Sequence, residues 1–172
     1  MTFANASRGL RIAETDYEYM TEGAYGLIFL DRKLGRIRKV YRRRQDADQA
    51  HCSAVFESER QAFELAARVP EISALVPLYF GQSEAGRIID RDGKDVTGEV
   101  YPCLSFEAEY LPGTFEKIGT IDASERQRVM SLFFSADIKH MTDASVRIAN
   151  GVVDKVIDFA VREIELEAQP LC

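Results

Sequence analysis

Two glycines, a lysine and a few carboxylates have the types and spacing that phosphate chemistry requires. Gly23 and Gly26 lie between predicted strands, where the missing Cβ lets the backbone approach a ligand. Backbone N–H groups in such a turn can face phosphate oxygens, although an ordinary hairpin turn explains the same glycines. Lys39 lies in the middle of a later predicted strand, where its ammonium could meet phosphate. Glu57 or Glu59, on the next predicted helix, could hold that lysine in place.

Two further carboxylates bracket a predicted hairpin near the C-terminal end of the sequence. Asp143 precedes this hairpin and Asp158 follows it. One of them could orient or deprotonate a substrate hydroxyl while the other binds Mg²⁺, as phosphoryl transfer requires. Taken singly, each is equally compatible with a surface or capping aspartate. The extended segment before Pro112-Gly113 offers backbone groups that could pair with the edge of a purine.

These residues need a mixed framework of strands and helices to position them. Alternating apolar residues predict strands, with turns at Lys33-Leu34-Gly35 and at Asn150-Gly151. Helical spacing predicts one helix over 47–68, ended by Pro70, and an amphipathic helix from Asp122 or Ser124 whose apolar stripe reaches His140. The tail after residue 160 is expected to be a strand or a short helix. The expected strands are 17–20, 27–30, 36–41, 75–80, 87–89, 100–110, 146–148 and 152–157.

The composition narrows the class of protein. The 172 residues are 46% hydrophobic, enough for a sizeable core, so wholesale disorder is excluded. The formal net charge of -6 argues against a nucleic-acid binder, and the basic stretch 38–44 is expected to be a solvated strand edge that could steer an acidic target. The three cysteines, which form no close pair, favour a reducing compartment. No signal peptide or membrane span is expected, and the chain is expected to be monomeric.

The order of the motifs resembles that of the protein kinase family. Glu22-Gly23-Ala24-Tyr25-Gly26 looks like the second and third glycines of the kinase glycine-rich loop, and Lys39 occupies the place of the phosphate-binding lysine. The resemblance implies that Glu59 pairs with Lys39, with Glu57 as the alternative. Ala108-Glu109-Tyr110-Leu111 is similar to the kinase hinge, so Ala108 would be the gatekeeper. The Glu109 carbonyl and the Leu111 N–H would then contact adenine.

The resemblance continues into the C-terminal part with departures from the kinase pattern. His140-Met141-Thr142-Asp143 looks like a stretched catalytic loop, and Asp158-Phe159-Ala160 looks like the metal-binding triplet. Thr21 replaces the first loop glycine, and Ile148 stands where the family keeps a second metal-binding asparagine, with Asn150 nearby. Few residues follow Ala160, which implies a chain without an activation segment.

The sequence therefore predicts an α+β, minimal two-lobed kinase-like fold. The expected parts are a flexible leader (1–15), an N-lobe (16–111) and a truncated C-lobe (112–172). The resemblance implies an ATP- and Mg²⁺-dependent protein Ser/Thr kinase, most similar to minimal bacterial type III effector kinases that phosphorylate a host chaperone. Its place would be the bacterial cytoplasm or, after secretion, the host cytosol. The alternative is a catalytically dead kinase-fold binding module: a pseudokinase, inhibitor or immunity partner.

Overall fold

The computed structural model describes residues 5–166, and the chain divides into two compact units. The first unit comprises Met1–Phe56 and Tyr79–Tyr110, and the second comprises Glu57–Leu78 and Leu111–Cys172. The segment Glu57–Leu78 was expected with the N-terminal part. It belongs to the second unit because Ala62, Ala66 and Ile72 are buried in that unit's core.

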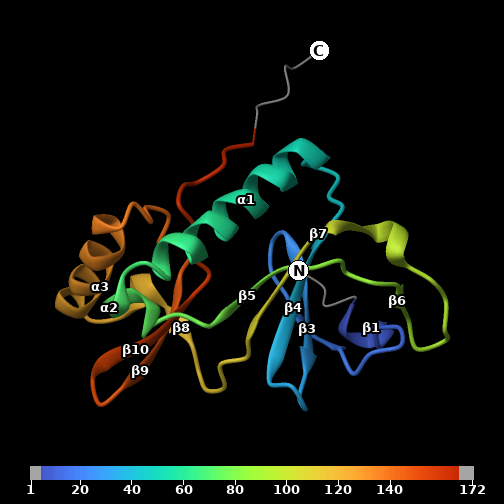
Figure 1. The fold of residues 1–172 in the computed structure, drawn as a ribbon, viewed down its shortest axis with the longest axis horizontal. Coiled ribbons are helices and arrows are strands. Elements are labelled where there is room, and N and C mark those ends of the chain that lie inside the picture. The colour runs from blue at the N-terminus through green and yellow to red at the C-terminus, as the bar shows by residue number, and fades with distance from the viewer. Residues whose placement is uncertain (1–4, 167–172) are drawn as a thin grey trace. The chain divides into compact units, whose positions relative to one another are not determined.

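The first unit is built on a curled, seven-stranded antiparallel sheet (Figure 1). The strand order is β5-β7-β4-β3-β2-β1-β6, with two short 3₁₀ helices, Ala6–Arg8 and Thr97–Glu99, beside it. Its apolar core gathers Leu27, Phe29 and Val40 from the central strands. The strands are β1 (Arg11–Ile12), β2 (Glu18–Glu22), β3 (Gly26–Asp31), β4 (Arg36–Arg42), β5 (Tyr79–Gln82), β6 (Ile88–Ile89) and β7 (Val100–Glu109).

The central hairpins of this sheet are those that the sequence predicts. β3 and β4 pair from Gly26↔Tyr41 to Asp31↔Arg36. The turn between them places Gly35 at φ +63°, a left-handed conformation that glycine adopts without a Cβ clash. The buried Asp31 carboxylate accepts hydrogen bonds from the Lys33 and Leu34 amides at 2.9 and 3.0 Å, which closes the turn.

The expectation of a flexible N-terminal leader is wrong for residues 5–15; residues 1–4 lie outside the described part of the chain. β1, which is residues 11–12 of this segment, pairs with both β2 and β6 and is therefore an internal strand of the sheet. Leu10 and Ile12 are only 2% and 1% exposed and belong to the core. Two apolar residues are too short a run to predict a strand, and burial against distant strands stabilises this one.

The long helix α1 (Gln49–Ala66) matches the predicted helix closely. The chain after this helix differs from the predicted structure. The Asp48 side chain accepts the His51 amide at 2.8 Å and so caps the first turn. Pro70 begins a short second helix, α2 (Pro70–Ser73), a position that proline favours. The expected strand 75–80 is wrong over residues 75–78, since β5 begins at Tyr79.

The second unit packs helix α3 (Ala123–Ser135) with a three-stranded antiparallel sheet of order β10-β9-β8. Asp122 caps α3 by accepting the amides of Ser124 and Glu125, as the sequence predicts. The predicted apolar stripe does not reach His140, because α3 ends at Ser135. The strands are β8 (Glu116–Lys117), β9 (Ser145–Ala149) and β10 (Val152–Ile157), and a 3₁₀ turn, Ile118–Thr120, follows β8.

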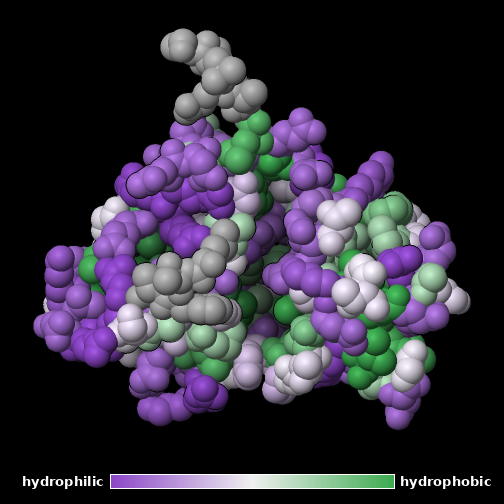
Figure 2. Space-filling model, turned by 180° about the vertical axis from the view of Figure 1, so that it is seen from behind, coloured by the Kyte–Doolittle hydropathy of each residue, from purple (hydrophilic) through white to green (hydrophobic). Residues whose placement is uncertain are grey.

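Two negative findings complete the fold. Residues 161–166 form neither a strand nor a helix, so the expectation for the tail is wrong over that range. None of the helices among residues 5–166 is long and apolar enough to cross a membrane. Figure 2 shows hydrophilic residues over most of the visible surface and hydrophobic residues in several separate groups.

Candidate functional site

The glycine turn, defined here as residues 22–26, connects β2 to β3 within the first unit. The Gly23 N–H donates to the Gly26 carbonyl at 2.9 Å and closes the turn. Within residues 5–166, no group accepts a hydrogen bond from the amides of Ala24 and Tyr25. These two successive amides are donors whose hydrogen bonds no other group of the described residues takes up. The turn thus has the donors that a phosphate would need.

Lys39 lies in the centre of β4, and its side chain passes directly over Gly26. A Cβ added at Gly26 would stand 3.1 Å from both the Cγ and the Cε of Lys39. The Lys39 ammonium lies 5.2 Å from the ring centroid of Tyr41 and 6.0 Å from that of Phe106, within reach of cation–π attraction. The structure therefore brings Lys39 and the glycine turn together, as the sequence predicts.

The two candidate partners of Lys39 are on the part of α1 that belongs to the second unit. Glu57 accepts from Arg60, with 2.9 Å between Arg60 Nε and Glu57 Oε2, so this carboxylate is already engaged on its own helix. Glu59 is half-buried. The pairing of Glu59 or Glu57 with Lys39 stays a prediction.

The segment predicted to contact adenine runs from the end of β7 into the second unit. Ala108 is 1% exposed and pairs in register with Ile37 and Tyr79. Glu109 is the last residue of β7, and Leu111 is the first residue of the second unit after it. The Tyr110 amide donates to the Gly35 carbonyl at 2.9 Å, which holds the end of this strand. The adenine-binding roles of Glu109 and Leu111 stay predictions.

In the second unit, Asp143 and Asp158 lie at the open end of the β9–β10 hairpin. The last residue of β10, Ile157, is opposite the first residue of β9, Ser145. Asp158 follows the former and Asp143 precedes the latter by two residues. This register places both aspartates at the same end of the two neighbouring strands, as their positions in the sequence predict.

Both aspartates are exposed, and each is held by its neighbours rather than by packing of its own side chain. Asp143 is 78% exposed at its side chain and has one carboxylate oxygen 3.4 Å from His140 Nε2. Its backbone carbonyl accepts a hydrogen bond of 2.7 Å from Lys117 Nζ. Asp158 has a left-handed φ of +60°, while Phe159 next to it is 2% exposed. This burial anchors the backbone from which the Asp158 carboxylate reaches solvent.

Asn150 cannot replace the missing second metal-binding asparagine. It lies with Gly151 in the hairpin turn, both at positive φ (53° and 79°), at the end opposite Asp158. The turn dipeptide thus has a structural role, and the expected position, Ile148, is an exposed apolar residue.

Within residues 5–166 no three or more His, Cys, Asp or Glu side chains cluster in a way that could hold a metal. Mg²⁺ is commonly held by one or two carboxylates together with phosphates and water, so the metal-binding role of Asp158 stays a prediction.

The basic stretch 38–44 is not the free edge that the sequence predicts, because its arginines pair within the first unit. Arg38 donates to Glu107 at 2.6 Å, and this carboxylate also accepts from Tyr17 at 3.0 Å. Arg42 lies 3.1 Å from Glu22. Arg44 pairs with Asp46. Alternation along one strand gave no signal of these partners, since most of them come from other strands or loops.

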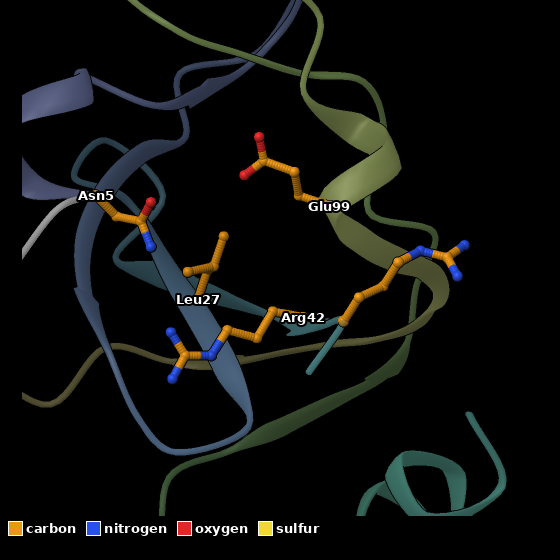
Figure 3. Close-up of a pocket in the computed structure, with 5 residues that line it drawn as sticks. Asn5, Leu27, Arg42 and Glu99 are labelled. Carbon is orange, nitrogen blue, oxygen red and sulfur yellow. The ribbon is translucent and has the colours of Figure 1, made fainter. Parts of the chain in front are cut away.

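A pocket of about 350 Å³ lies beside β3 and β4 of the first unit (Figure 3). Leu27 lies between Asn5, Glu99 and Arg42 in this view. Two charged side chains that line the pocket already have partners. Arg42 pairs with Glu22, and Glu99 accepts two hydrogen bonds from Arg8 at 2.7 and 2.8 Å. The walls therefore present few unpaired charges to a ligand. The pocket is lined by Asn5, Leu27, Arg42, Arg43 and Glu99.

The chain was compared with protein-family models, with curated proteins and with solved structures, and none of the three comparisons found a match.

Proposed function

We propose that this protein is a minimal ATP- and Mg²⁺-dependent protein Ser/Thr kinase that acts on another protein, such as a host chaperone. The observation that carries the proposal is the pair of exposed aspartates, Asp143 and Asp158, at the open end of the β9–β10 hairpin. The glycine turn with its two available amides and the lysine over Gly26 add independent support within the first unit. Phosphoryl transfer depends mainly on positioning and on neutralising charge, so a short set of residues is sufficient.

Each residue of this set has a role that its chemistry permits. Asp143 accepts the proton of the substrate hydroxyl as that oxygen bonds to the γ-phosphorus, while the bond from this phosphorus to the β,γ-bridging oxygen breaks and ADP leaves. Lys39 binds phosphate oxygens through its ammonium. Asp158 is the residue that would hold Mg²⁺, which when bound neutralises charge on the phosphates. His140, 3.4 Å from the Asp143 carboxylate, orients this carboxylate.

Two observations favour a second candidate, a kinase-fold binding module without turnover. Asn150 is at the wrong end of the hairpin to bind a second metal ion, and the described residues offer no cluster of three metal-ligating side chains. A protein that binds nucleotide without transferring phosphate would be consistent with this smaller set of ligands.

A comparison of Asp158→Asn with Asp137→Asn tests the proposal. Asp137 is the matched control because it is also an exposed aspartate of the second unit with a left-handed φ, +63°. Asparagine tolerates this conformation, so neither variant should misfold. Radiolabelled phosphate transfer from ATP to a purified, folded chaperone and to proteins of a host lysate gives the activity, and the Mg-ATP-dependent rise in melting temperature gives binding.

Three outcomes of this comparison bear on the two candidates. Loss of transfer by about 100-fold or more in Asp158→Asn, with Asp137→Asn unaffected, supports the kinase. Nucleotide binding without transfer in the wild-type protein supports the binding module. A wild-type protein that is folded but shows no thermal shift at millimolar Mg-ATP contradicts the kinase and any binding module that uses nucleotide.

A further inference from the structure

Two arginines from the segment at the end of β4 converge on one backbone carbonyl of the glycine turn. Arg44 donates to the Ala24 carbonyl, and Arg42 donates to the same oxygen at 3.2 Å. Arg42 also bonds Glu22, the first residue of the turn, at 3.1 Å. These bonds join charged donors to a turn that has only one internal backbone hydrogen bond of its own, from Gly23 to Gly26.

This arrangement determines the direction in which the turn presents the Tyr25 amide. In a trans peptide the C=O and the following N–H point in opposite directions. The structure has no cis peptide among its described residues, so an Ala24 carbonyl directed at the arginines turns the Tyr25 N–H away from them. That amide is one of the two without an internal acceptor.

Tyr25 fixes the tip of the turn from a second direction. Its hydroxyl lies 2.9 Å from His51 Nε2, and the two rings stack with their centroids 5.7 Å apart. The guanidinium carbon of Arg44 lies 4.7 Å from the centroid of the Tyr25 ring. Arg44 therefore contacts the turn at a carbonyl and at an aromatic face, while Asp46 holds its other nitrogens.

The burial of Arg44 excludes a role as a free surface charge. Its side chain is 20% exposed, far less than expected for an arginine that attracts a partner from solution. We infer that Arg44 is a positioning residue: it holds the glycine turn so that the amide of Tyr25 faces the phosphates of a bound nucleotide. This inference rests on the proposed function. It adds Arg44 as a residue that supports the proposed phosphate site, a role that the resemblance to kinases does not include.

The test compares the dissociation constants of Mg-ATP and of adenosine for four proteins. These are the wild type, Arg44→Ala, Asp46→Asn and the control Lys33→Ala, which removes an exposed ion-paired cation at the other end of β3. Arg44→Ala is expected to bind Mg-ATP about tenfold more weakly and adenosine unchanged, because only the phosphate contacts depend on the turn. Lys33→Ala is expected to match the wild type for both ligands.

Asp46→Asn distinguishes positioning from simple charge attraction by the sign of its effect. It removes a negative charge and loosens Arg44. If Arg44 acts by charge alone, Mg-ATP binding strengthens, whereas a positioning role predicts that it weakens. Wild-type affinity in Arg44→Ala, or tighter binding in Asp46→Asn, overturns the inference and leaves the proposed function standing. A wild-type protein that does not bind Mg-ATP overturns both.

Discussion

His140 and Ala160 exchange both of their backbone hydrogen bonds, at 3.0 and 3.1 Å. The bridge ties the segment before Asp143 to the segment after Asp158, and the register Ile157↔Ser145 ties the same two segments from the hairpin side. Further along the chain, the Arg162 amide donates to Ser58 Oγ at 3.1 Å. The two aspartates therefore project from backbone that is bonded on both sides, a rigid support of the kind that the proposed catalytic role would require.

Asp143→Asn is expected to lower kcat by about 10²–10⁴ while leaving the KM for ATP nearly unchanged. An amide cannot accept the hydroxyl proton, but it keeps the shape and the contact with His140. Steady-state kinetics with a protein substrate separate the two constants. A variant that retains the wild-type kcat would remove Asp143 from the mechanism.

Gly26→Ala and Gly23→Ala are expected to differ in stability. A methyl group at Gly26 meets two Lys39 carbons at 3.1 Å and the Val40 carbonyl oxygen at 3.3 Å, so it should lower the free energy of unfolding by about 1–3 kcal/mol. At Gly23 no atom lies within 4 Å of the added Cβ, and stability should stay within about 0.5 kcal/mol. Urea denaturation measures both values.

The same two variants report on the ligand site. The space beside Gly23 that is open in the protein is where the phosphates are proposed to lie, so Gly23→Ala should weaken Mg-ATP binding despite its normal stability. Gly26→Ala should weaken binding as well, because it displaces Lys39. Unchanged Mg-ATP affinity in Gly23→Ala would place the nucleotide elsewhere.

Glu107→Gln is expected to destabilise the protein by about 3 kcal/mol, because it breaks a largely buried pair and leaves Arg38 uncompensated. The side chains of Glu107 and Arg38 are only 17% and 15% exposed. Burial acts to raise the pKa of Glu107, but hydrogen bonds from Arg38 and Tyr17 outweigh it and lower this pKa. Denaturation of Glu107→Gln beside Glu18→Gln, an exposed glutamate of β2, gives the comparison. Equal stabilities of these two variants would show that the Arg38–Glu107 pair contributes nothing to the free energy of unfolding.

Glu125 is expected to make the stability of the protein pH-dependent in acid. Hydrogen bonds from Arg128 and from the Val153 amide lower the pKa of Glu125 to about 2, although burial opposes them. The folded pKa is below the unfolded value of about 4.3, so the stabilisation is complete above that pH and is lost as the pH falls toward 2.

Denaturation of the wild type and of Glu125→Gln between pH 7 and pH 2 measures this effect. The variant should be less stable by about 1–3 kcal/mol at pH 7, and the difference should vanish near pH 2. Glu163→Gln, an exposed glutamate, is the control and should parallel the wild type. A difference that does not change with pH would show that Glu125 contributes by packing and not by its charge.

Local chemistry in the sequence determined the regular elements around the candidate site. The glycines of the β2–β3 turn, the Asn150-Gly151 dipeptide and the capping Asp122 each act on their immediate neighbours, so their effects could be predicted without knowledge of the fold. The same holds for Lys39, whose position in the middle of a strand follows from apolar alternation. The position of Asp158 directly after a strand follows in the same way.

Only the tertiary structure decided which distant residues meet. The burial of Leu10 and Ile12, the bridge between His140 and Ala160 and the arginines around Ala24 all depend on partners far along the chain. A single sequence carries little signal for such pairs, because many acids and bases are available and the fold selects among them through burial and register. For the same physical reason, residues 38–44 resemble a free basic edge in the sequence, while in the structure arginines of this stretch pair with acids and hold the glycine turn.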